Sequence, residues 1–169
     1  YHGDFAQALI ALDAVVEVQG RRGTRHIPFS KLHHLPGRTP NVETDLAPDE
    51  IVVAIEVPAG PWTRRSCYLK IRDRQSYAFA LASAAVALDM DGDRVKESRI
   101  ALGGVATVPW RAQDAEKALA GQVLDEATAT AAADAAFAGA EPHRHNAFKI
   151  PLGKQTLARA LLETRDMKA

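Results

Sequence analysis

The sequence predicts an α+β protein, in which an antiparallel sheet of three to four strands packs with a three-helix layer. The first observation is a run of three β-rich segments between residues 67 and 103, two of them joined by Asp91-Gly92, a dipeptide typical of hairpin turns. The second is a change of hydrophobic period after Pro109, where three helical segments follow. Strands followed by a block of helices are typical of this fold class.

The chain begins with a segment that favours a short helix over residues 4–12. Asp4 is a good N-cap, and Gln7 three residues later completes a pair similar to a capping box. The valine-rich segment 14–19 then alternates as a strand does, and residues 24–29 return after a Gly-Arg-Arg-Gly turn. We therefore expect a β-hairpin after the helix.

A loop rich in proline, residues 30–48, separates this hairpin from a further strand at Ile51–Val57, whose β-branched residues favour extended structure. Pro58 ends that strand, and Ala59-Gly60-Pro61 is the clearest boundary in the chain. The sequence thus predicts two parts, residues 1–58 and residues 59–169.

Three strands are expected in the second part, near Cys67–Arg72, Tyr77–Leu88 and Val95–Gly103. Lys70, Arg72 and Arg74 share one parity, so a strand would present them on one face, and the same holds for Tyr77 and Phe79. Cations that lead into aromatic residues of one parity suit an anionic, planar ligand.

The helical block is expected at Arg111–Ala120, which Gly121 stops, at Asp125–Ala138, and at Pro151–Glu163. Asp125 lies favourably at the positive end of the second of these helices. Pro151 belongs in the first turn of the third, because deeper inside it would break the hydrogen-bond ladder.

Composition excludes several classes of protein. Lys+Arg and Asp+Glu are equal in number, so the formal net charge is zero, which argues against a nucleic-acid binder. No apolar run is long enough for a membrane span, and no signal-peptide pattern opens the chain. Cys67 is the only cysteine, so this chain alone cannot form an intramolecular disulfide or ligate an iron–sulfur cluster; we expect it to be a small hydrophobe in a strand.

No residue is predicted to be catalytic or to bind a metal. The histidine pairs His33-His34 and His143-x-His145 lack the spacing of a zinc site and are expected in surface loops. Gly103-Gly104 lacks the surroundings of a phosphate loop, so close backbone packing is the preferred interpretation. The serines have no nucleophile-elbow context.

Five segments, taken in their order and spacing, resemble the FAD-binding (medium) subunit of molybdenum-containing hydroxylases, the family of xanthine dehydrogenase, aldehyde oxidoreductase and carbon monoxide dehydrogenase. They are GDFAQALIALDAVVEVQG at 3–20, LAPDEIVVAIEVP at 46–58, YLKIRDRQSYAFALASAAVAL at 68–88, RIALGGVATVPWRAQDAE at 99–116 and HNAFKIPLGKQTLARALLE at 145–163. The family's glycine-rich phosphate-binding loops have no counterpart in this sequence. The resemblance therefore implies the C-terminal part of a longer subunit.

Within that resemblance, residues 1–58 would be the last portion of a partial α/β FAD-binding subdomain, and residues 59–169 the flavoprotein C-terminal domain. The family's FAD takes electrons from iron–sulfur clusters on one partner subunit and passes them to an external acceptor. Substrate is oxidised at a molybdenum cofactor on another subunit or domain. We expect a cytoplasmic oxidoreductase subunit, with a periplasmic complex as the open alternative, and the isolated fragment is expected to be inactive.

The resemblance also implies cofactor contacts for particular residues. Asp4 matches an acidic residue that contacts the flavin, Ile51-Val52 a strand that lies along it, and Lys70 a lysine near the polar edge of the ring system. Tyr77 and Phe79 match variable positions that flank the ring. Each has a plainer interpretation: Asp4 as an N-cap, Lys70 as a surface charge paired with Asp73, and the two aromatic residues as core.

Two other functions stay open on the sequence. The chain could be a cofactor-free assembly or interaction module of the same complex, because the glycine-rich half that supplies most pyrophosphate contacts is absent. An unrelated α+β enzyme is the third hypothesis, but no acid–base constellation supports it.

Overall fold

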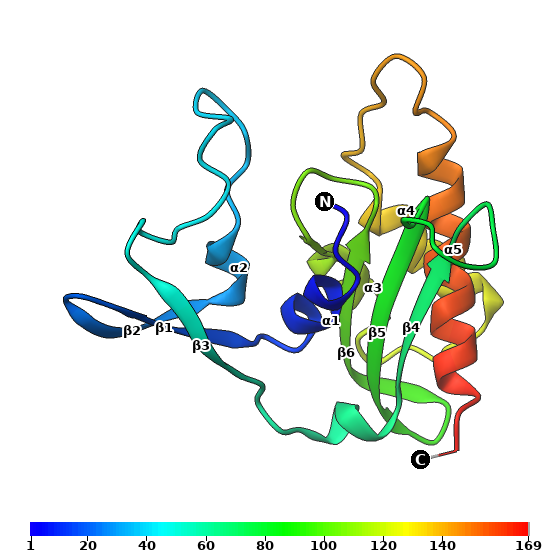
Figure 1. Ribbon diagram of the computed structural model, residues 1–169. Helices are drawn as coiled ribbons and strands as arrows, with labels where there is room; N and C mark the ends of the chain where they lie inside the picture. The colour runs from blue at the N-terminus through cyan, green and yellow to red at the C-terminus, as the bar shows by residue number, and fades with distance from the viewer. Residues whose placement is uncertain (169) are drawn as a thin grey trace.

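The computed structural model describes residues 1–168, which form two antiparallel sheets and the helices around them (Figure 1). The smaller sheet has the strand order β2-β1-β3, and the larger has the order β4-β5-β6-β7. The strands are β1 (Val15–Gly20), β2 (Gly23–Pro28), β3 (Ile51–Glu56), β4 (Ser66–Ile71), β5 (Ala82–Asp91), β6 (Arg94–Gly103) and β7 (Trp110–Arg111).

The smaller sheet contains the hairpin that the sequence predicted, with β1 and β2 paired from Val15 opposite Pro28 to Gly20 opposite Gly23. The predicted strand at residues 51–57 is also confirmed, and it pairs antiparallel with the other edge of β1. A four-residue helix, α2 (Phe29–Leu32), begins the segment that was expected to be loop. One face of β1 is buried through Val16 and Val18.

The larger sheet is built on the long β5–β6 hairpin, in which Asp91 lies opposite Arg94 and Gly92 occupies the turn with φ 60°. The predicted Asp91-Gly92 hairpin is therefore confirmed, because glycine adopts a positive φ without steric cost. The two-residue edge strand β7 was not predicted, since no periodicity can develop over so short a segment.

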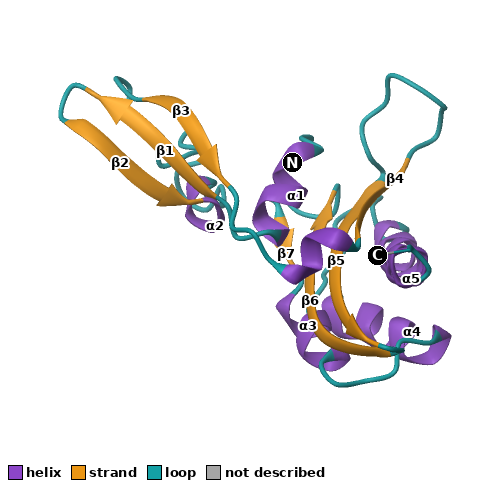
Figure 2. Ribbon diagram, turned by 90° about the horizontal axis from the view of Figure 1, so that it is seen from below, coloured by secondary structure: helices purple, strands orange, loops and turns teal. Residues whose placement is uncertain are grey.

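Helices cover both faces of the larger sheet (Figure 2). On one face lies α1 (Phe5–Ala11), packed near Ala85 and Ala101, whose small side chains admit a helix at close range. On the other face lie α3 (Gln113–Leu119), α4 (Glu126–Ala136) and α5 (Lys149–Arg165). This arrangement confirms the predicted antiparallel sheet with a three-helix layer.

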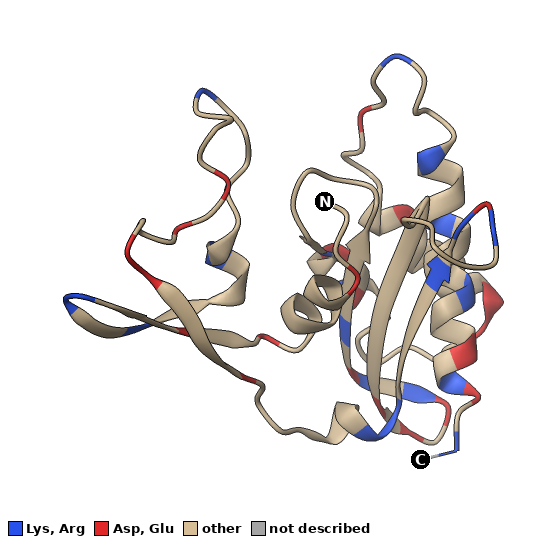
Figure 3. Ribbon diagram, in the orientation of Figure 1, with Lys and Arg blue, Asp and Glu red and all other residues tan. Residues whose placement is uncertain are grey.

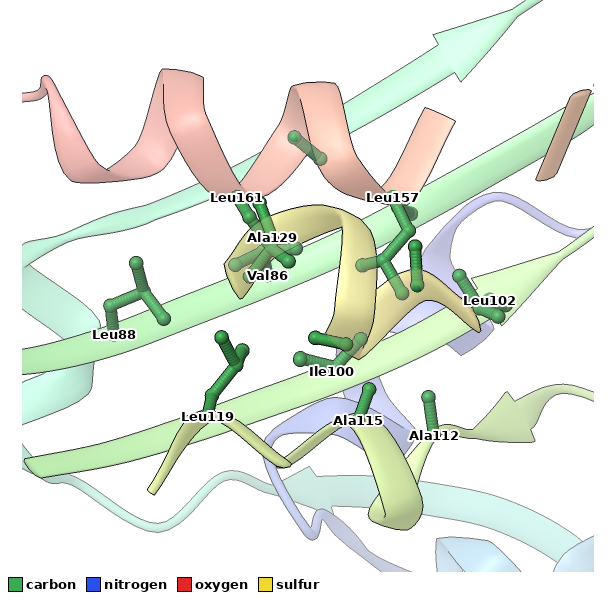
Figure 4. Close-up of a cluster of buried hydrophobic side chains, with 14 of the residues drawn as sticks. Val86, Leu88, Ile100, Leu102, Ala112, Ala115, Leu119, Ala129, Leu157 and Leu161 are labelled. Carbon is green, nitrogen blue, oxygen red and sulfur yellow. The ribbon is translucent and has the colours of Figure 1, made fainter. Parts of the chain in front are cut away.

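The main core lies between the larger sheet and this three-helix layer (Figure 4). Val86 and Ile100 are opposite each other on β5 and β6, and they face Ala129 of α4 and Leu157 and Leu161 of α5. All five side chains are almost completely buried. Successive side chains of β5 and β6 point to opposite faces of the sheet, so each strand contributes to this core and to the core on the side of α1.

The helix ends follow the predicted sequence features. Pro151 lies in the first turn of α5, and Gly121 follows the C-cap of α3 with φ 73°. Asp125 is the N-cap of α4 and forms a reciprocal capping box with Thr128, with a 2.8 Å hydrogen bond from the Thr128 backbone N–H. These features stop and start helices where backbone groups would otherwise lack partners.

The predicted strand at Tyr77–Leu88 is wrong in its first part. β4 ends at Ile71 and β5 begins at Ala82, so residues 72–81 form a loop, closed by a 2.8 Å hydrogen bond from the Leu81 N–H to the Ile71 carbonyl. Tyr77 has φ 55°, which is incompatible with a strand. The apolar composition of residues 77–81, at the end of this loop, resembles that of the strand that follows.

Gly104 packs directly against the backbone at the end of this loop, which confirms the close-packing interpretation of Gly103-Gly104. Its φ is 72°, and a Cβ atom there would lie 2.9 Å from the Ala80 carbonyl oxygen. We therefore expect Gly104→Ala to lower the free energy of unfolding by about 1–2 kcal/mol, from strain and the backbone contact together. Urea denaturation measures the change.

Gly139→Ala is the matched control, because a Cβ atom at Gly139 would meet nothing within 4 Å. It should change the free energy of unfolding by no more than about 0.5 kcal/mol. Equal losses for the two variants would contradict the role given to Gly104.

Basic and acidic residues are interspersed along both sheets and the helices (Figure 3). This distribution agrees with a formal net charge of zero. Among residues 1–168, no helix combines the length and the apolar character that a membrane crossing would need.

Candidate functional site

Asp4 joins the start of α1 to β4 through two hydrogen bonds to its carboxylate. Lys70 donates from Nζ to Oδ2 at 2.7 Å, and Tyr68 donates from its hydroxyl to Oδ1 at 2.8 Å. Tyr68 and Lys70 are two residues apart on β4 and therefore lie on the same face of the strand. The structure thus brings two of the predicted site residues, Asp4 and Lys70, into direct contact.

The predicted capping box between Asp4 and Gln7 is wrong. Asp4 occupies the N-cap position of α1, but its side chain caps no backbone N–H. Gln7 is buried and lies against Gly103, where a Cβ atom would come within 2.3 Å of its amide nitrogen. Asp4 bonds and Gln7 packs against residues distant in sequence, which a local capping rule does not consider.

The ion pair between Asp4 and Lys70 influences the pKa of the Asp4 carboxyl. Burial alone would raise the pKa of Asp4, but the hydrogen bonds from Lys70 and Tyr68 and the charge of Lys70 leave it below its ordinary value. Burial raises the pKa of Tyr68 to about 12, and the Asp4 carboxylate contributes in the same direction. At neutral pH the Asp4 carboxyl is therefore ionised and the Tyr68 phenol is neutral.

We expect Lys70→Ala to raise the pKa of Asp4, because the carboxylate then loses the hydrogen bond and the positive charge that offset the effect of burial. In the unaltered chain the folded-state pKa lies below the unfolded value of about 3.9. The stabilisation from the ionised Asp4 is thus present above that value and is lost as the pH falls through the lowered one. An NMR titration of the Asp4 carboxyl carbon measures both pKa values, and an unchanged pKa in the variant would show that Lys70 does not control this carboxylate.

Tyr77 and Phe79 project from the loop at residues 72–81 into solvent, with 95% and 68% of their surfaces exposed. The ring of Phe79 contacts the imidazole of His2, with ring centroids 4.8 Å apart. Arg74 donates a hydrogen bond to the Tyr77 carbonyl from within the loop. The prediction that the two aromatic side chains share a strand face is wrong, but neither belongs to the core, so the plainer interpretation of them is wrong too.

The base of this loop is held in place by Lys149, at the beginning of α5. Its ammonium group donates to the Leu81 carbonyl at 2.8 Å and to the Gly104 carbonyl at 2.9 Å. The lysine therefore ties the start of β5 to the end of β6. It thereby holds in place the beginning of β5, the strand that follows the loop at residues 72–81, which we call the aromatic loop.

A cavity of about 550 Å³ is lined in part by His2, whose imidazole contacts Phe79. It lies among residues 1–3, the loop that includes His33 and His34, and residues 107–108. Burial and the charge of the chain's amino group lower the pKa of His33. A second cavity, of about 470 Å³, lies among the helices α3 to α5, and no predicted site residue lines it.

Ile51 and Val52 lie in the smaller sheet, at the beginning of β3 (Figure 1). Both are exposed, Ile51 by 65%, and neither is in the cluster of Asp4 and Lys70. The structure thus places the predicted residues in three groups: the Asp4–Lys70 pair, the aromatic loop and the β3 surface. Sequence reasoning missed Tyr68, although its parity with Lys70 on a predicted strand could have identified it.

Nearly the whole chain matches known protein families. Residues 67–164 match the CO dehydrogenase flavoprotein C-terminal domain, and residues 1–60 match the FAD binding domain in molybdopterin dehydrogenase. The chain belongs to this flavoprotein family. The resemblance inferred from the five sequence segments is thereby confirmed, while the division at residues 58 and 59 stays a prediction.

Individual relatives show the same relationship. The aldehyde oxidoreductase FAD-binding subunit PaoB of Escherichia coli is 44% identical over 163 residues, which are 96% of this chain and 48% of that protein. The nicotine 6-hydroxylase medium subunit of Paenarthrobacter nicotinovorans is 36% identical over 79% of this chain and 44% of its own length. This chain spans about half the length of these curated relatives.

Among solved structures, quinoline 2-oxidoreductase from Pseudomonas putida 86 superposes with a TM-score of 0.84 and 27% sequence identity. The superposition covers 96% of this chain and 56% of that chain. The fold is therefore that of the family across both sheets.

Proposed function

We propose that this chain forms one wall of an FAD site in the flavin subunit of an oxidoreductase of the molybdenum hydroxylase family. The observation that carries the proposal is the Asp4–Tyr68–Lys70 cluster beside an exposed aromatic loop, in a chain that matches both family domains in order. A carboxylate, a phenol and an ammonium group supply acceptors and donors for the polar edge of a flavin ring.

The residues fit the chemistry of an isoalloxazine. Lys70 would donate to a carbonyl of the ring and stabilise negative charge there, and Asp4 would accept from a ring N–H. Tyr77 or Phe79 would cover one face of the ring, because aromatic planes stack favourably at a small cost in conformational entropy. Ile51 and Val52 would add an apolar surface from β3. FAD, when bound, supplies electron transfer between donors and acceptors that differ in the number of electrons they exchange.

The proposal extends to the rest of the complex. An iron–sulfur subunit would supply electrons, a molybdenum-cofactor subunit would oxidise the substrate, and the complex would work in the cytoplasm. The names of the relatives, an FAD-binding subunit and a medium subunit, support such an assembly. Molybdenum and iron–sulfur clusters would be held by those partner chains and not by this one.

The test is to add FAD to the isotopically labelled chain and to follow backbone and side-chain NMR shifts. We expect shifts concentrated at Tyr68, Lys70 and the loop at residues 72–81. An absorption spectrum after desalting then reports whether the flavin is retained. If FAD causes no shifts in these residues at millimolar concentration, the proposed wall is wrong.

A second candidate is a cofactor-free assembly module of the same complex. The exposed apolar surface of β3 favours it, since this edge strand presents a row of exposed residues: Ile51, Val52, Val53 and Ile55. Unpaired strand edges of this kind readily add a strand or a partner. The absence of FAD-dependent shifts would favour this function over the first.

A further inference from the structure

Glu17, His26 and Glu56 come together on one face of the smaller sheet, one from each of its strands. Glu17 on β1 lies opposite His26 on β2, and Val15 on β1 lies opposite Glu56 on β3. Directly paired residues share a face, and so do Val15 and Glu17, which are two residues apart. Val16 and Val18 are buried on the other face, so the three polar side chains lie on the exposed one.

The ligand atoms of these side chains are close enough for a single ion. One ligand atom from each residue lies within 4.8 Å of the other two, and the His26 Nε2 atom is 3.6 Å from the Glu56 Oε1 atom. Three ligands at about 2.1 Å around a tetrahedral ion lie about 3.4 Å from one another. Small rotations of exposed side chains therefore suffice to bring all three into coordination.

Charge also favours a cation at this position. Two glutamates with one histidine carry excess negative charge at neutral pH. Within residues 1–168, neither carboxylate forms an ion pair with a lysine or an arginine, and Glu56 has only the imidazole of His26 as a partner. Arg25, next in sequence to His26, pairs instead with Asp45 and Glu50.

We propose that Glu17, His26 and Glu56 bind a divalent transition-metal ion, with zinc as the expected occupant. An imidazole nitrogen with two carboxylates is a donor set typical of zinc and its neighbours, whereas calcium and magnesium prefer oxygen ligands alone. Water would complete the coordination. The ion links all three strands and thereby fastens β3, which enters the sheet after a long loop, to the β1–β2 hairpin.

The experiment is a calorimetric titration of the chain with zinc chloride, repeated with cobalt(II) and followed by visible absorption. We expect one equivalent of ion per chain. His26→Gln, Glu17→Gln and Glu56→Gln should each weaken binding at least tenfold and remove the cobalt absorption band. Zinc should also raise the melting temperature of the unaltered chain, but not that of His26→Gln.

The matched control is His34→Gln, which removes an exposed histidine beside Asp45 in another part of the chain. It should bind zinc as the unaltered chain does. Unchanged affinity in His26→Gln would overturn the site, and so would calcium binding as tightly as zinc, because either result would reveal only a surface of mixed charges. The test does not depend on FAD, so its outcome is separate from that of the proposed function.

Discussion

Replacement of Leu161 by alanine is expected to lower the free energy of unfolding by about 3 kcal/mol. Leu161 lies on α5 with 0% of its surface exposed, packed in the core between the larger sheet and the three-helix layer (Figure 4). Removing three carbon atoms there loses their transfer free energy, and it leaves a cavity that two packed layers cannot easily close. Urea denaturation should show a lower midpoint with an unchanged slope.

Leu35→Ala is the control for this prediction, because Leu35 is a leucine in a loop with 65% of its surface exposed. The same atoms are removed there without leaving a cavity, so the loss should be below about 0.5 kcal/mol. A loss at Leu161 as small as that at Leu35 would mean that α5 is not packed as described.

Lys70→Ala is expected to weaken FAD binding at least tenfold and to lower the reduction potential of the bound flavin, if the proposed function holds. The substitution removes the ammonium group that would stabilise negative charge on the reduced ring. It also leaves the Asp4 carboxylate with Tyr68 as its remaining hydrogen-bond partner from β4, so the local charge changes from balanced to negative. Both consequences oppose a reduced, anionic flavin.

The measurement is a flavin titration together with a spectroelectrochemical potential, on the subunit that carries FAD. Lys154→Ala is the control, since Lys154 lies on α5 and pairs with Asp134 instead. It should change neither quantity. If Lys70→Ala leaves the FAD affinity and the reduction potential unchanged, Lys70 is not part of the flavin site. Its ion pair with Asp4 in the unaltered chain is then a structural contact only.

Much of the fold could be predicted because its features are local. The Asp91-Gly92 turn, the position of Pro151 in α5 and the cap at Asp125 each follow from a few neighbouring residues. The β1–β2 hairpin follows from alternation on either side of a glycine-flanked turn. Such features are decided by backbone sterics and hydrogen bonding within one or two turns of chain.

The errors have a common physical cause, which is contact between residues far apart in sequence. Asp4 binds Lys70 instead of capping α1, and Gln7 is buried against Gly103. The end of β4 at Ile71 determines where β5 begins, so the segment before Ala82 is loop despite its strand-like composition. The Glu17–His26–Glu56 cluster likewise requires knowledge of which strands pair.

The chain forms the smaller sheet between α1 and β4, two elements of the larger body that the larger sheet and its covering helices make up. The helix α1 packs on the larger sheet, the chain then leaves to form β1, β2 and β3, and it returns as β4, an edge strand of the larger sheet. Asp4 precedes α1 and Lys70 lies near the end of β4, so their ion pair joins two elements of the larger body and includes no residue of the smaller sheet. Changes in the length or sequence of the smaller sheet would therefore leave the geometry of this ion pair unaltered, because both of its residues belong to the larger body.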